Sequence, residues 1–149
     1  MSDAIKHECG IALVRLRKPL SYYIEKYGSP MYAVNKMYIL MEKQRNRGQD
    51  GVGVANIKID QKPGLRYISR YRSIESEPIK AIFEKIGRKY KKAKKDGKDN
   101  YYDERWLKEN CAFTGEVRMG HLRNGKHGKN SNENRHPFQR QNNSRSRNL

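Results

Sequence analysis

Apolar residues and cysteines are both scarce in this sequence. Only 35% of its 149 residues are hydrophobic, and its mean hydropathy is −1.10. No apolar run approaches the roughly 18 residues that a membrane-spanning helix needs, and the N-terminus lacks the basic-then-apolar order of a secretory signal. The two cysteines, Cys9 and Cys111, are too few for a disulfide framework, and the four histidines have no zinc-binding spacing with either of them. We therefore expect a single-domain cytoplasmic protein with no membrane span and no metal site.

Acidic residues are also scarce, and the net charge is +17. Residues 1–60 carry a net charge of only +4, whereas residues 61–149 carry +13, concentrated in residues 80–98 and after Arg118. Such an excess is typical of nucleic-acid binders. However, a run such as KYKKAKK more often forms the solvated end of a helix, and no nucleic-acid motif accompanies it. From the sequence alone we therefore do not expect a nucleic-acid partner, and a nucleic-acid-binding protein is kept as an alternative.

The hydrophobic pattern predicts a mixed α+β domain. Residues 9–16 form a short apolar run without helical spacing, which predicts a buried strand. A Pro-Gly turn between 51–60 and 65–72 predicts a hairpin. The other expectations are a short helix ending near Gly28, helices over 31–48 and 76–95, a polar loop over 96–110, a strand over 113–125, and a poorly ordered segment over 126–149.

Three short motifs follow one another in the chain: CGIALV at residue 9, NRGQDGVG at 46 and GHLRNGKHGKNS at 120, with HPF at 136–138 behind them. Together they resemble the glutaminase domain of the class II glutamine amidotransferases, and within that family they are most similar to amidophosphoribosyltransferases. The likeness runs from about residue 7 to the last residue. It implies an α+β fold, the αββα Ntn-hydrolase sandwich of two antiparallel sheets between helical layers, here incomplete on its C-terminal side.

The resemblance assigns a catalytic role to Cys9. In this family a thiolate attacks the side-chain amide of glutamine, and the free α-amino group of the same residue is the base. Such an amine has a reference pKa of about 7.7 to 8.0. The resemblance therefore implies that residues 1–8 are a propeptide, cleaved between Glu8 and Cys9. Taken alone, Cys9 would more often be an inert buried strand cysteine, which is also our expectation for Cys111.

The same resemblance implies the substrate-binding residues. Arg123 matches the arginine that binds the glutamine α-carboxylate, a task that suits the guanidinium fork. Arg47, Gln49 and Asp50 match a conserved loop of the family that lines the site. His121 belongs to the third motif, although a histidine packed within a strand is the preferred reading for it.

The resemblance also implies the overall reaction. Glutamine is the substrate, and its ammonia passes to a second domain that uses phosphoribosyl pyrophosphate and Mg²⁺ in purine synthesis. Cofactors are therefore not expected in this chain, and the relatives are homo-oligomers. Lys126 replaces the family threonine, and the oxyanion-hole motif of the family would lie beyond Leu149. We therefore expect residues 9–149 to be an incomplete glutaminase domain, inactive alone. The alternatives are a basic nucleic-acid-binding protein and a non-catalytic partner of a full-length homologue, with which it would pair through a strand edge.

Overall fold

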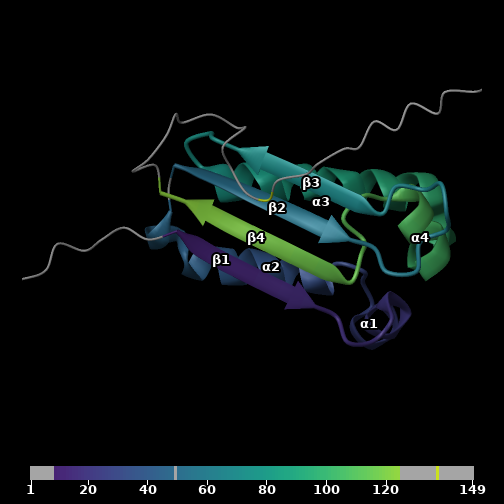
Figure 1. The fold of residues 1–149 in the computed structure, drawn as a ribbon. Coiled ribbons are helices and arrows are strands. Elements are labelled where there is room, and N and C mark those ends of the chain that lie inside the picture. The colour runs from purple at the N-terminus through teal and green to yellow at the C-terminus, as the bar shows by residue number, and fades with distance from the viewer. Residues whose placement is uncertain (1–8, 49, 125–136, 138–149) are drawn as a thin grey trace, which may run out of the picture.

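The structure is a computed structural model that describes residues 9–48, 50–124 and 137. These residues form a mixed α+β domain built on one antiparallel sheet, which confirms the expected class (Figure 1). Its elements, in chain order, are β1 (Gly10–Arg15), α1 (Leu20–Tyr27), α2 (Tyr32–Lys43), the 3-10 turn η1 (Arg45–Arg47), β2 (Gly51–Ile57), β3 (Ile68–Ser73), α3 (Pro78–Gly97), η2 (Lys98–Tyr102), α4 (Glu104–Asn110) and β4 (Val117–Arg123).

The sheet has four strands in the order β1-β4-β2-β3, and every neighbouring pair is antiparallel. The last strand of the described residues therefore lies between the first two. Gly10 of β1 pairs with Leu122, and Gly51 of β2 pairs with Arg123. As a result, the beginnings of β1 and β2 and the end of β4 meet at one end of the sheet, although more than 100 residues separate β1 from β4 in the chain.

Helices α2 and α3 cover one face of this sheet (Figure 1). Because side chains alternate along a strand, Val52, Val54 and Leu122 point to that face and are completely buried or nearly so. Met41 of α2 contacts β4 so closely that a Cβ on Gly120 would lie 2.6 Å from its Sδ. On the opposite face, which no helix of the described residues covers, Ile11 and Leu13 remain 67% and 65% exposed.

Most of the expected elements are confirmed. The hairpin forms between β2 and β3, and the short first helix ends at Gly28, whose φ of 68° is the left-handed conformation that glycine adopts readily. The long helix α3 begins at Pro78, where a missing N–H costs nothing. The segment expected to be poorly ordered falls outside the described residues, apart from Pro137.

Three expectations were wrong, one about the type of an element and two about boundaries. Residues 96–110 are helical rather than a loop: the Asp103 carboxylate accepts a hydrogen bond from the Trp106 N–H at 2.8 Å and caps α4, which is too short to show a periodic apolar stripe. The helix expected over 31–48 ends at Lys43, where a 3-10 turn takes over. Strand β4 begins at Val117 rather than near Phe113, whose positive φ of 62° does not suit a strand.

A buried ionic cluster fixes the other end of the sheet. The Lys108 ammonium donates to the Glu116 carboxylate and to the Ile59 carbonyl, the latter at 2.6 Å. Glu116 also accepts a hydrogen bond from the Ile59 N–H at 2.8 Å, and Lys58 donates to the Lys108 carbonyl at 2.5 Å. All three charged side chains are buried, and burial lowers the pKa of Lys58. The Lys108–Glu116 ion pair and the hydrogen bonds to backbone groups offset the cost of removing these charges from water.

Candidate active site

Cys9 lies directly before β1, at the end of the sheet where β4 finishes. Its side chain is exposed, so it is not the buried strand cysteine that burial preferences alone would favour. The backbone N–H of Asn124 donates to the Cys9 sulfur at 3.5 Å. Gly10 pairs with Leu122 in the antiparallel register of β1 and β4. Cys9, one residue earlier, therefore lies opposite Arg123, one residue later.

Arg123 is the last residue of β4 and lies between the other two motifs. Gly51 pairs with it from the β2 side, and its carbonyl accepts a hydrogen bond from the Asp50 N–H at 3.1 Å. Strand alternation directs its side chain to the face opposite α2 and α3, where it is nevertheless only 7% exposed. A carboxylate bound to this guanidinium would therefore be partly shielded from water, which strengthens a charged pair.

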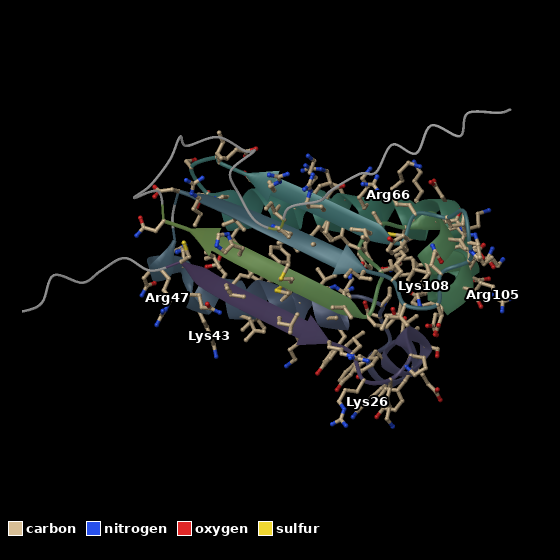
Figure 2. All side chains as sticks on the ribbon, viewed as in Figure 1. Lys26, Lys43, Arg47, Arg66, Arg105 and Lys108 are labelled. Atoms are coloured by element: carbon tan, nitrogen blue, oxygen red, sulfur yellow. The ribbon has the colours of Figure 1, made fainter. Side chains whose placement is uncertain are left out.

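The loop that carries the second motif packs directly on the end of β4. A Cβ on Gly48 would lie 2.6 Å from the carbonyl carbon of Leu122 and 2.7 Å from the nitrogen of Arg123, so only glycine fits there. Arg47 and Asp50, on either side, are exposed, and Figure 2 shows Arg47 at this end of the sheet. Gln49 lies outside the described residues. Of the three loop residues assigned to the site from the sequence, the structure therefore brings two to it.

His121 lies two residues before Arg123 on the same face of β4. It pairs with Ile11 on one side and with Gly53 on the other, and it is 9% exposed. This position agrees with the preferred reading of a histidine packed within a strand. It also places the imidazole on the open face of the sheet, on the same side as the Arg123 guanidinium, so that His121 can form part of the wall of the site.

Gln44, directly after α2, is a supporting residue that sequence reasoning missed. Its side-chain amide donates to the Ile11 carbonyl at 3.1 Å, and a Cβ on Gly10 would lie 3.0 Å from its Oε1. Gln44 thus holds the outer edge of β1 within two residues of Cys9. The sequence signal for this role was its position three residues before Arg47. Polar residues at helix ends are too common for that position alone to identify a supporting residue.

The second cysteine lies in a different environment. Cys111 is buried, and burial raises the pKa of its thiol to about 11, against the opposing effect of Lys58 and Lys89. Such a thiol is almost entirely protonated near neutral pH and is a poor nucleophile. The chain therefore carries one accessible thiol, at the meeting point of three motifs, and one shielded thiol elsewhere.

The described residues contain no group of three or more His, Cys, Asp or Glu side chains that could hold a metal ion. Within the same part of the chain, no helix has the length and apolar character needed to cross a membrane.

Comparisons with known proteins give no independent assignment. A scan against protein-family models, a search of curated proteins and a search of solved structures each found no match to this chain. The interpretation of the site therefore depends on its motifs and on the geometry described above.

Proposed function

We propose that this chain carries the glutaminase site of a class II glutamine amidotransferase, most similar to amidophosphoribosyltransferases. The observation that supports this best is the convergence of three motifs that are far apart in the sequence. Cys9, Gly48 with Asp50, and Arg123 meet at one end of the sheet through the Asn124–Cys9 and Asp50–Arg123 hydrogen bonds and the Gly48 contact with β4. An accidental likeness in three short motifs would not require them to be neighbours.

The architecture also supports the αββα sandwich as the finer fold. Within the described residues, the four-stranded antiparallel sheet has helices on one face only, and its other face exposes large apolar side chains on three strands. These residues are Ile11, Leu13, Ile57 and Met119. A sheet face of this kind is usually covered by a second layer. In the proposed fold, that layer is the second sheet of the sandwich.

The proposed chemistry starts with removal of residues 1–8, which frees the Cys9 amine. That amine accepts the thiol proton, and the thiolate attacks the side-chain amide carbon of glutamine. The carbon–nitrogen bond breaks, and the leaving nitrogen takes the proton and departs as ammonia. In a complete glutaminase domain, water then hydrolyses the thioester, which releases glutamate and restores the cysteine. Arg123 binds the α-carboxylate of the substrate throughout, and the ammonia is used by a phosphoribosyl pyrophosphate-dependent partner domain.

Mass spectrometry and a glutamine analogue test this proposal together. Purified protein should have the mass of a chain that begins at Cys9; a chain that begins at Met1 or Ser2 cannot use the Cys9 amine. With 6-diazo-5-oxo-norleucine, we expect one adduct, at Cys9, which excess glutamine suppresses. Cys111→Ala is the matched control and should react like the wild type, whereas Cys9→Ala should not react.

Arg123→Lys separates recognition of the substrate from simple thiol reactivity. The lysine keeps the charge but loses the fork. We expect the variant to react normally with iodoacetamide, which needs no carboxylate site, and to need at least 10-fold more glutamine for protection against the analogue. Equal protection in both proteins, or an adduct on Cys111, would contradict the proposal.

A further inference from the structure

A strongly charged surface lies along the later part of α3, outside the candidate site. Its lysines and arginine at positions 85, 88, 89, 92 and 95 follow spacings of three and four residues, so they form one stripe along the helix. All five are exposed. Among the described residues, Lys92 has an ion pair with Asp96 at 2.5 Å, and the other four have no acidic partner within salt-bridge distance.

This stripe borders a groove between α3 and α4. Lys89, Lys92 and Asp96 line one wall, and Trp106 and Asn110 of α4 line the other. The volume of the groove is about 400 Å³, within the usual range for sites that hold small ligands. The indole of Trp106 packs against Gly97, where a Cβ would lie 2.3 Å from the ring, so its orientation is fixed.

A second aromatic ring lies at the other end of the stripe. The Lys85 ammonium stands 4.8 Å from the centre of the Tyr71 ring on β3, and that ring in turn contacts Phe113. Burial raises the pKa of Tyr71, while the nearby charges of Arg66 and Arg88 act against it. Figure 2 shows Arg66 on the β3 side of the sheet. Cations therefore surround a half-buried aromatic ring here as well.

We propose that this surface binds single-stranded nucleic acid. Exposed lysines spaced along a helix suit the phosphates of a flexible strand, and a fixed aromatic ring beside them provides a platform on which a base can stack. The sequence hid this combination because Trp106 lies 14 residues beyond Lys92, across a segment expected to be a loop. The lysine run alone indicated only a solvated helix, whereas the structure places an aromatic groove beside it.

The single tryptophan of the chain makes the test direct, because its fluorescence reports on this groove alone. The full chain is titrated with 12-nucleotide oligo(dT) and oligo(U), and with heparin, a polyanion without bases. We expect one or both oligonucleotides to quench the fluorescence and heparin to leave it nearly unchanged. With three phosphate contacts, the affinity should fall roughly 20-fold between 50 and 200 mM salt. The two oligonucleotides distinguish DNA from RNA as the preferred strand.

Two variants with the same net charge complete the test. Lys85, Lys89 and Lys92 are changed together to glutamine in one, and the exposed Lys18, Lys26 and Lys36 in the other. We expect the first to lose at least 10-fold in affinity measured by quenching, and the second less than 2-fold. Equal losses, quenching by heparin as strong as by the oligonucleotides, or no quenching by either oligonucleotide would overturn the proposal.

Discussion

Gly48 gives the sharpest test of how the second motif contacts β4. Its φ of −158° is extended backbone that any residue adopts, so the only obstacle to alanine is space. The new methyl carbon would lie 2.6 Å from the Leu122 carbonyl carbon and 2.7 Å from the Arg123 nitrogen. Carbon atoms pack best at about 3.5 to 4.0 Å, so loop and strand must separate by roughly 1 Å.

The cost of this separation follows from the contact atoms. Both belong to the backbone of a central strand paired on both sides, so they cannot move aside as a flexible side chain would. Overpacking of this kind costs about 1 to 3 kcal/mol. For a chain of this size, about 3 °C of melting temperature is lost per kcal/mol. We therefore expect Gly48→Ala to melt about 3 to 9 °C below the wild type.

Gly87→Ala is the matched control for this measurement. Gly87 lies within α3 and its Cβ would meet no atom within 4 Å, so alanine should stabilise the helix by about 0.5 to 1 kcal/mol. Thermal denaturation followed by circular dichroism compares the two variants, and the rate of Cys9 alkylation shows whether the loop shift reaches the sulfur. If Gly48→Ala melts within 1 °C of the wild type and Cys9 reacts unchanged, the contact between loop and strand is not as described.

Three further substitutions test other parts of the structure. Glu116→Gln removes the closer of the two carboxylates that face the buried Lys108 ammonium, the other being Glu104 at 3.7 Å, and should cost about 3 kcal/mol in urea unfolding. Glu109→Gln, which breaks a more exposed pair, should cost less than about 1 kcal/mol. Burial raises the pKa of the Cys111 thiol from 9.0 to about 11 in the folded protein. Between pH 9 and 11 the unfolded thiol therefore loses its proton before the folded one does, and the free energy of unfolding falls as the pH rises. This fall should be less steep in Cys111→Ala than in the wild type. Asp103→Ala removes the cap of α4 and should cost about 1 kcal/mol, whereas Asp103→Asn should retain most of it.

Sequence patterns predicted the elements whose apolar faces are long. Helix α3 shows a clear stripe, because seven of its residues are buried along 20 positions. The hairpin was equally clear, since a Pro-Gly turn separates two apolar runs. In contrast, α4 has only seven residues, and just two of them are buried. A helix this short is determined by its cap and by tertiary contacts rather than by periodicity.

The arrangement of the site required the strand order, which no local pattern contains. Insertion of β4 between β1 and β2 places Arg123 next to both Cys9 and Gly51. The motifs indicated that these residues act together, but only the register shows how. Gln44 illustrates the remaining gap: its hydrogen bond to the Ile11 carbonyl spans 33 residues and depends on the packing of α2 against the edge strand.

The two proposed sites should act independently, because α3 separates them. The helix begins beside Gly48, with which Ser76 to Lys80 share a pocket, and it ends beside α4. From Pro78 a helix rises about 10 Å to Lys85 and about 21 Å to Lys92, so the changed lysines lie at or beyond the 7 to 10 Å within which substitutions usually interact. Changing Lys85, Lys89 and Lys92 to glutamine should therefore leave the labelling rate of Cys9 by the glutamine analogue within 2-fold of the wild type, and Cys9→Ala should leave oligonucleotide quenching equally unchanged. A change beyond that factor in either direction would show that charge on α3 and reactivity at Cys9 are coupled through the sheet, and the two functions would then have to be treated as one.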